Sequence, residues 1–323
     1  MTEPFAPRSA RRPLRAMHAA LAARQYFLDG RTIKDIAAEL GVSRFKVARL
    51  IDWARAEGLV RVEVAGAIRS DPELSADLRA GYGLEDALVV ADLDGSADAI
   101  APELAEVAAL AVAEIVTPSD VVGISWGRTL DLLVEQLPDL TATKVVQLIG
   151  GFATLESASG GIELVRRFAE KAHADGYPLL APLRVRDPAA AASLRRDPIV
   201  AETLRLIDEV TVVVAGIGAW GDPPASRMAE CFSAREVAKL RRQGVCADMC
   251  GLLFAADGEA LRAWADERIG IDAPQLEGVR TVVAVAGGVE KREALAAVLR
   301  SGVVDVVITD AGSARSLLDH PSS

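Results

Sequence analysis

The chain has 323 residues, of which 51% are apolar and 25% charged, a composition typical of a globular protein long enough for two domains. No run of apolar residues is long enough to predict a membrane span, and the arginine-containing start Met1–Arg15 lacks the apolar core of a secretory signal. The three cysteines lack metal-ligand spacing, which favours reduced thiols, no metal site and a cytoplasmic protein.

The net charge of −10 is unevenly distributed. Residues 1–65 hold 12 Lys and Arg against 7 Asp and Glu, a net of +5, so residues 66–323 carry −15. Because an acidic surface repels a polyanion, any contact with nucleic acid is expected from residues 1–65. The charge pattern therefore predicts an N-terminal DNA-binding domain at 1–65, which begins with a basic tail, and a second domain at 66–323.

Three helices are predicted in the N-terminal domain. The first covers Met17–Leu28, the second begins after a Thr32 cap, and the third begins after a Ser43 cap and runs to about Glu57. A short turn that contains Gly41 joins the second helix to the third. Helix, glycine-containing turn and helix is the arrangement of a helix-turn-helix.

The third helix is the expected recognition helix, since its spacing buries one side and exposes basic and aromatic side chains on the other. Such a helix suits the major groove of double-stranded operator DNA. The residues expected at this interface are Thr32, Ser43, Arg44, Phe45, Lys46 and Arg49. Residues 58–62 are predicted to form a short wing strand or a linker strand. The alternative is a plain three-helix bundle with a solvated basic face.

From about Asp71 onward, short β-branched runs alternate with alanine-rich helical stretches. This pattern predicts one α/β domain with a Rossmann-like parallel sheet covered on both faces. The predicted strands are 87–91, 120–125, 144–150, 210–218, 280–288 and 303–310. The predicted helices include Glu103–Val116, Gly161–Ala174, Ala234–Arg242 and Glu290–Arg300.

Four of these strands end in glycine-bearing loops, and ligands of open parallel sheets bind beyond the carboxyl ends of the strands. The loop GISWGRTL at Gly123–Leu130 offers hydroxyls, an arginine and backbone donors at one helix start, the features of a phosphate or sugar cradle. Lys291 is placed to pair with a phosphate or carboxylate. Asp248 and Asp310 are candidates for bonding sugar hydroxyls, although Asp310 equally fits a cap of the last helix.

The glycine loops match neither the dinucleotide-binding pattern nor the phosphate loop of nucleotide hydrolases, so no cofactor is expected. An enzyme of the sugar-phosphate isomerase type with an accessory N-terminal module is the alternative reading of the second domain. It needs a positioned acid and base. None of the three histidines lies in a strand-end loop, and Glu290 is the one plausible base. We therefore expect a regulator without catalytic residues.

The motifs resemble those of the SorC family of bacterial sugar-sensing regulators and occur in the same order along the chain. The resemblance extends from about residue 20 to residue 319. The matching stretches are DGRTIKDIAAELGVSR at 29–44, GLVRVEV at 58–64, GISWGRTL at 123–130, VVQLIGG at 145–151, GGVEKREAL at 287–295 and ITDAGSA at 308–314. The chain departs from the usual pattern at Ala48, at Ala311 and in CADMCG at 246–251. These departures bear on the identity of the sugar and leave the DNA-binding role intact.

The resemblance implies a winged helix-turn-helix joined to an effector domain, which is similar in fold to sugar-phosphate isomerases and CoA transferases but regulatory. It also implies a homotetramer, a dimer of dimers, that binds an operator and responds to a phosphorylated sugar or polyol. By the same resemblance, the effector-binding residues are Gly123, Ser125, Trp126, Gly127, Arg128, Thr129, Gly150, Gly151, Asp248, Gly287 and Lys291.

Overall fold

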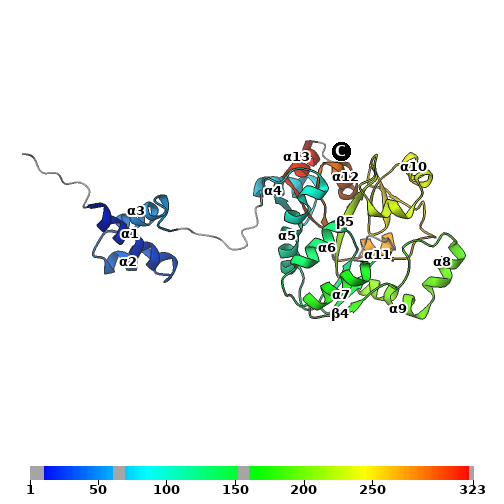
Figure 1. The fold of residues 1–323 in the computed structure, drawn as a ribbon, viewed down its shortest axis with the longest axis horizontal. Helices are drawn as coiled ribbons and strands as arrows, with labels where there is room; N and C mark the ends of the chain where they lie inside the picture. The colour runs from blue at the N-terminus through cyan, green and yellow to red at the C-terminus, as the bar shows by residue number, and fades with distance from the viewer. Residues whose placement is uncertain (1–10, 61–69, 152–159, 320–323) are drawn as a thin grey trace, which may run out of the picture. The chain divides into compact units, whose positions relative to one another are not determined.

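A computed structural model describes residues 11–60, 70–151 and 160–319. The chain divides into two compact units, Met1–Ala67 and Ile68–Ser323, whose placement relative to each other is not determined (Figure 1). Residues 1–10 of the predicted basic tail and residues 61–62 of the predicted wing lie outside the described residues. None of the described helices is long and apolar enough to cross a membrane.

The smaller unit contains the three predicted helices, α1 (Arg11–Phe27), α2 (Ile33–Glu39) and α3 (Arg44–Ala56). The hydroxyl of Thr32 caps α2 and the hydroxyl of Ser43 caps α3, as their positions in the sequence predict. In the turn between these helices Gly41 has a φ of 62°, a backbone conformation that favours glycine. The buried side chains that join the helices are Ala19, Ala22, Ala23, Ile36, Ala37, Val47, Leu50, Ile51 and Ala54.

The larger unit is built around a parallel sheet with the strand order β1-β10-β9-β5-β2-β3-β4. Its strands are β1 (Asp86–Val90), β2 (Val121–Ile124), β3 (Lys144–Gln147), β4 (Asp175–Tyr177), β5 (Val212–Ala219), β9 (Thr281–Val285) and β10 (Val306–Asp310). All six predicted strands are present, each shorter than or shifted from its predicted range by a few residues. Short apolar runs predicted this parallel sheet correctly.

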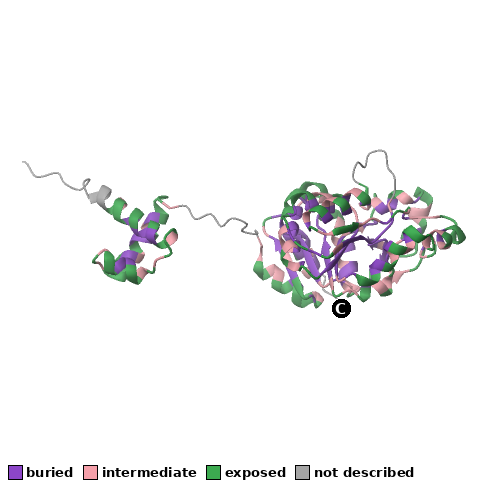
Figure 2. Cartoon of the chain, turned by 90° about the horizontal axis from the view of Figure 1, so that it is seen from below, coloured by how far each residue is buried: buried purple, intermediate pink, exposed green. Residues whose placement is uncertain are grey.

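Helices cover both faces of the sheet, and the strands between them form the buried interior (Figure 2). Successive strand residues alternate between two cores: Val212 and Val214 pack into one, Val213 and Ala215 into the other. One core includes α5 (Ala97–Ile115), α6 (Arg128–Gln136) and α7 (Gly161–Lys171). The other includes α4 (Pro72–Tyr82), α12 (Arg292–Arg300) and α13 (Ala311–Asp319).

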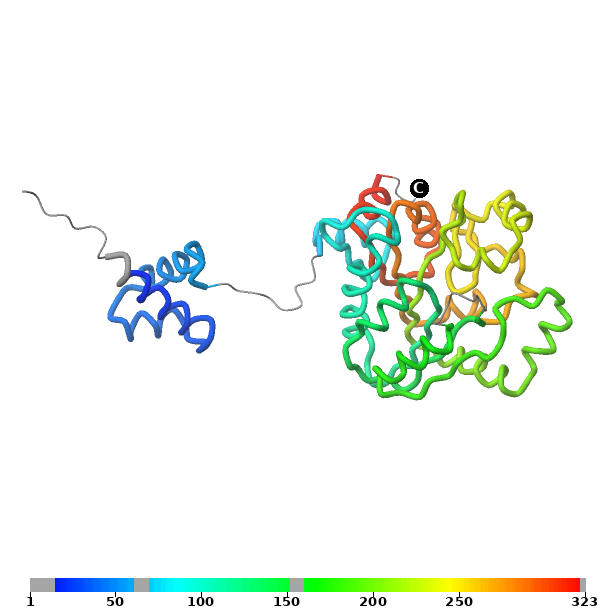
Figure 3. Tube along the Cα trace, viewed as in Figure 1, coloured from blue at the N-terminus to red at the C-terminus, as the bar shows by residue number. Residues whose placement is uncertain are grey.

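Elements from the two ends of the larger unit lie side by side, since α4 packs against α13 (Figure 3). The Tyr82 hydroxyl on α4 donates a hydrogen bond to the Leu317 carbonyl on α13, at 3.3 Å. The remaining helical elements are α8 (Pro188–Arg195), α9 (Pro198–Leu206), α10 (Ala234–Arg242), α11 (Ala273–Glu277) and the 3₁₀ turns η1 (Ile207–Glu209), η2 (Arg227–Cys231) and η3 (Val289–Lys291).

Apart from α1, which begins at Arg11, six residues before the predicted Met17, two features differ from the sequence-based expectation. Helix α5 begins six residues before the predicted Glu103, because Ser96 caps it and Pro102, a residue that usually marks a helix boundary, is accommodated inside it. The second difference is an antiparallel extension of the sheet, β6 (Val245–Met249), β7 (Leu252–Ala255) and β8 (Ala260–Leu261). The last residues of β5 pair with β6, so β5 leaves the parallel sheet at its carboxyl end.

A buried carboxylate, Asp120, joins the starts of three central strands. It is 1% exposed and accepts hydrogen bonds from the Thr117 backbone and hydroxyl at 2.8 Å, the Thr211 hydroxyl at 2.7 Å and the Arg280 guanidinium at 2.7 Å. Burial alone would raise the pKa of Asp120, but these hydrogen bonds outweigh it and lower the pKa to about 2. The ionised carboxylate therefore stabilises the amino-terminal edge of the sheet.

We predict that Asp120→Asn destabilises the larger unit by about 2 kcal/mol at neutral pH, because the folded pKa of Asp120 lies below its ordinary 3.8. A carboxylate whose pKa is lowered by folding contributes fully to the free energy of unfolding at pH values above its pKa in the unfolded state. This contribution is lost as the pH falls through its pKa in the folded state. The difference between variant and wild type should thus shrink below pH 3.8 and vanish near the folded pKa of about 2.

Urea unfolding at neutral and acidic pH measures this difference, with the exposed Asp139→Asn as a control that should match wild type at both. A pH-independent loss in Asp120→Asn would contradict the assigned role of its charge.

Candidate nucleic-acid interface and ligand cavity

Four predicted DNA-contacting side chains, Arg44, Phe45, Lys46 and Arg49, are exposed on α3. Phe45 is 83% exposed, so its ring is accessible to a partner. The opposite side of α3 packs into the core as predicted. The Thr32 and Ser43 hydroxyls are engaged as helix caps. The structure thus presents two guanidinium groups, an ammonium and an aromatic ring on one exposed helix, an arrangement that suits DNA.

The other helices of the smaller unit hold α3 in place. The Gln25 side chain on α1 donates to the Glu39 carboxylate on α2 at 3.0 Å, and Arg31 pairs with the same carboxylate. The hydrogen bond from Arg31 lowers the pKa of Glu39 and keeps it ionised. On α3, Trp53 lies against the guanidinium of Arg15 at 4.9 Å. The contacts of Glu39 join α1 and α2, the Arg15–Trp53 contact joins α1 to α3, and none of them involves Arg44, Phe45, Lys46 or Arg49.

A cavity of about 80 Å³ opens in the larger unit at the carboxyl ends of β2 and β5. The strand order explains the position of the cavity. In the sheet, β3 and β4 lie on one side of β2, whereas β5, β9 and β10 lie on its other side. The loops after β2 and β5 consequently diverge and leave space that neither fills. Its polar and charged lining residues are Asp98, Ser125, Trp126, Arg128, Thr129, Ser226, Arg227, Asp248, Cys250 and Lys291.

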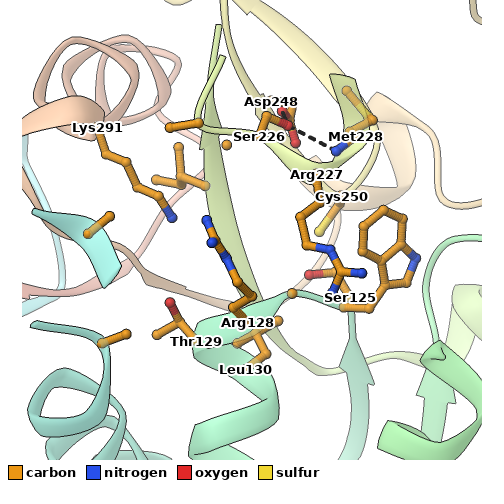
Figure 4. A pocket seen from close by; sticks show the side chains of 18 of the residues that line it. Ser125, Arg128, Thr129, Leu130, Ser226, Arg227, Met228, Asp248, Cys250 and Lys291 are labelled. Carbon is orange, nitrogen blue, oxygen red and sulfur yellow. Dashed lines mark hydrogen bonds between the residues drawn. The ribbon is translucent and has the colours of Figure 1, made fainter. Parts of the chain in front are cut away.

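Positive charge gathers in this cavity from three elements that are distant in sequence: Arg128 opens α6, Arg227 opens η2 and Lys291 ends η3 (Figure 4). Arg128 pairs with Asp98 at 2.9 Å, and both side chains are more than half exposed. The Lys291 ammonium makes no hydrogen bond or ion pair with any described residue, and burial lowers its pKa. Asp248 and Asp98 attract this ammonium, but no carboxylate of the described residues forms an ion pair with it.

Asp248 supplies the buried negative charge. Its Oδ1 accepts hydrogen bonds from the Trp220 indole at 2.7 Å and from the Ser226 hydroxyl, whose oxygen in turn accepts from the Met228 backbone at 3.1 Å (Figure 4). Burial raises the pKa of Asp248, and these hydrogen bonds only partly offset that effect. Oδ2 makes no hydrogen bond within the described chain and can accept one from a ligand hydroxyl.

Seven of the predicted effector-binding residues meet in this cavity, namely Ser125, Trp126, Gly127, Arg128, Thr129, Asp248 and Lys291. The Trp126 indole also donates to the Gly150 carbonyl at 2.9 Å, which links the β2 loop to the loop after β3. The β2 loop, a part of β6 and the η3 turn therefore form one site, although more than 160 residues separate the first from the last.

The other four predicted residues, Gly123, Gly150, Gly151 and Gly287, do not line the cavity. A side chain at Gly123 would lie 2.6 Å from Leu148, and one at Gly150 would lie 2.6 Å from the Pro182 backbone. At Gly287 it would collide with the Asp310 carboxylate. These three glycines are required by close packing, and Gly151 forms an isolated parallel bridge with Pro182. Their predicted contact with an effector stays a prediction.

Two further carboxylates singled out from the sequence support loops instead of facing the cavity. Asp310 is fully buried and accepts hydrogen bonds from the backbone of Gly288 and of Ser313, both at 2.8 Å, so its role is the cap. Glu290 accepts from the Ala97 backbone at 2.9 Å and thereby joins η3 to the start of α5. Among the described residues no group of His, Cys, Asp and Glu has the arrangement of a metal site.

Ser226 and Arg227 belong to the site but were not predicted. They follow β5 in the segment DPPASR at 222–227, which has no helical or strand period and no glycine-rich pattern. Their position depends on the antiparallel pairing of β5 with β6, which brings Ser226 against Asp248. The only feature of this segment that suggests binding of a polar ligand is the adjacent pair Ser226 and Arg227, and such a pair alone is a weak signal.

Comparisons with known proteins agree with both units. Residues 67–319 match the Sugar-bind family model, which describes a sugar-binding domain, and residues 21–62 match a helix-turn-helix model. The deoxyribonucleoside regulator of Bacillus subtilis is 26% identical over 92% of this chain and 96% of its own length. The transcriptional regulator LsrR of Escherichia coli K12 is 26% identical over 91% of this chain and 92% of its own length.

Solved structures share the fold. The full-length sorbitol operon regulator SorC of Klebsiella pneumoniae superposes with a TM-score of 0.71 at 23% identity, covering 94% of this chain and 99% of that one. A DeoR-family transcriptional regulator of Listeria monocytogenes gives a TM-score of 0.68 at 26% identity, covering 76% and 98%. With both units matched in one chain, the protein belongs to the SorC-type family of sugar-binding transcriptional regulators.

Proposed function

We propose that this regulator binds operator DNA through the exposed face of α3, and that a small phosphorylated sugar or polyol in the cavity between β2 and β5 controls this binding. The observation that carries the proposal is the Lys291 ammonium, which faces the cavity without a hydrogen bond or ion pair to any described residue. An anionic ligand would supply the missing counter-charge.

The phosphate is assigned to the start of α6. Gly127 caps this helix without a side-chain hydrogen bond, so its first backbone N–H groups are available. The Ser125 and Thr129 hydroxyls and the Arg128 guanidinium lie beside them (Figure 4). Because Arg128 now pairs with Asp98 on α5, a bound phosphate would compete with that carboxylate. Effector binding would thereby change the contact between α5 and α6.

The sugar or polyol is assigned to the side of the cavity at Asp248. A carboxylate whose Oδ1 is fixed by Trp220 and Ser226 presents Oδ2 in one orientation, which suits a ligand hydroxyl. The names of the related proteins support this chemistry, since one is called a deoxyribonucleoside regulator and another a sorbitol operon regulator.

The proposal includes a cytoplasmic homotetramer, a dimer of dimers, with no catalytic activity. An isomerase needs an acid and a base beside the substrate. Within the described lining, the carboxylates are Asp98, which pairs with Arg128, and Asp248, which is held by Trp220, and no histidine is present. Turnover of a ketose or aldose phosphate that Glu290→Gln abolishes would favour the enzyme instead.

A thermal-shift screen of sugar and polyol phosphates against the full chain tests the proposal, followed by operator binding with each hit. We expect at least one phosphorylated compound to raise the Tm while its unphosphorylated form does not, because a ligand of the native state stabilises it. If no compound raises the Tm, or if the protein gives no salt-sensitive shift with DNA from its own upstream region, the proposal fails.

We predict that Arg49→Ala weakens operator binding by roughly tenfold to a hundredfold, because a guanidinium in contact with DNA contributes about 1–3 kcal/mol. The effector-induced change in Tm should stay as in wild type, since the cavity is untouched. Fluorescence anisotropy with labelled operator measures the effect. Arg196→Ala is the matched control, because Arg196 is an exposed arginine of the other unit. If Arg49→Ala and Arg196→Ala bind the operator with equal affinity, Arg49 does not contact DNA.

We predict the reverse for Lys291→Met, which keeps the length of the side chain but removes its charge. Effector affinity should fall roughly tenfold to a hundredfold, since a hydrogen bond to a charged group contributes about 1.5–3 kcal/mol, and Arg128→Ala should also weaken the response. Operator binding without effector should stay near wild type. Calorimetry with the best screened phosphate measures affinity, with the exposed Lys239→Met as control. Unchanged binding to Lys291→Met would refute this assignment.

A further inference from the structure

A second cavity, of about 340 Å³, lies in the larger unit beside the antiparallel strands. Its walls come from the β6–β7 turn, from β8, from the following segment and from α11. The lining residues are Gly251, Leu252, Ala260, Leu261, Arg262, Trp264, Ala265, Arg268, Asp272, Ala273, Pro274 and Glu277. It is larger than the cavity between β2 and β5 and shares only Gly251 with that lining.

Arg268 is the unusual member of this lining, because it is only 7% exposed and has no carboxylate partner. Its Nη1 donates to the Ile271 carbonyl, and its side chain makes no other hydrogen bond or ion pair within the described residues. Burial lowers the pKa of Arg268 to about 10, so the guanidinium remains charged at neutral pH. In the same unit Arg184 pairs with both Glu236 and Glu267 at 2.7 Å. Arg268 lacks such a counter-charge.

We propose that this second cavity binds a small organic monocarboxylate with an apolar body. The planar guanidinium of Arg268 matches a carboxylate in geometry and charge. Leu252, Leu261, Trp264 and Pro274 supply apolar walls for the rest of the ligand. A buried cation in a lining that also has apolar walls is the recognition pattern for such an acid.

The charges around Arg268 favour a monoanion over a phosphate. Besides Arg268, the cavity is lined by one more arginine, Arg262, and by two carboxylates, Asp272 and Glu277, so its charged lining groups sum to zero. Asp272 attracts the Arg268 guanidinium without forming an ion pair with it. These two carboxylates would repel the second negative charge of a phosphate monoester. This ligand class is therefore distinct from the proposed sugar-phosphate effector, and the inference does not depend on that effector.

Isothermal titration of the full chain with phenylacetate tests the proposal, and phenylacetamide serves as the uncharged ligand of the same shape. We expect saturable binding of phenylacetate and at least tenfold weaker binding of phenylacetamide. Arg268→Gln should weaken phenylacetate at least tenfold, whereas the exposed Arg196→Ala removes an equal charge and should leave it unchanged. Inorganic phosphate should not compete with phenylacetate.

A second variant covers the case in which Arg268→Gln fails to fold. Ala273→Phe places a ring at the cavity wall and keeps Arg268, so it should abolish phenylacetate binding in a folded protein. Three results would overturn the proposal: equal affinity for acid and amide, unchanged phenylacetate binding in Ala273→Phe, or loss of binding in Lys291→Met, which would place the ligand in the other cavity. A change of oligomeric state in Arg268→Gln without any phenylacetate binding to wild type would instead assign Arg268 to a subunit interface.

Discussion

The reversal of strand order between β2 and β5 is the constraint on which the ligand site depends. Parallel strands place all their carboxyl ends at one edge of the sheet, and the connections from β2 and β5 leave that edge in opposite directions. The resulting space is bordered by Ser125–Thr129 on one side and by the end of β5 on the other. The departure of β5 into the antiparallel strands then adds Asp248, so the fold itself brings both charge types together.

The charges in the cavity are held in place by groups that do not face it. Trp220 and Ser226 orient Asp248, while Glu290 joins η3, which carries Lys291, to the start of α5. At the opposite edge of the sheet, Asp120 forms hydrogen bonds that join the starts of β2, β5 and β9. A pre-organised site of this kind loses little entropy when a ligand binds. It can influence DNA binding only if the ligand prefers one arrangement of the protein over another.

Much of this organisation could be predicted from the sequence, because its causes are local. Caps such as Thr32 and Ser43 and continuous apolar runs mark helices and buried strands, and the GISWGRTL loop concentrates polar groups at one helix start. The antiparallel strands were missed, since 245–255 mixes apolar residues with Asp248 and Gly251 and has no clear period. Arg227 was missed because its place depends on long-range pairing. Gly123 and Gly287 were predicted as ligand contacts, but glycine also serves close packing, which sequence alone does not distinguish.

Occupation of the cavity between β2 and β5 is proposed to change the affinity of α3 for DNA. The most direct test is the operator dissociation constant of the full chain, measured by anisotropy with and without a saturating concentration of the sugar or polyol phosphate that most stabilises the protein. We predict a change of at least about fivefold in wild type and none in Lys291→Met. An operator affinity that stays constant while the phosphate is bound to the wild-type protein would contradict the claim.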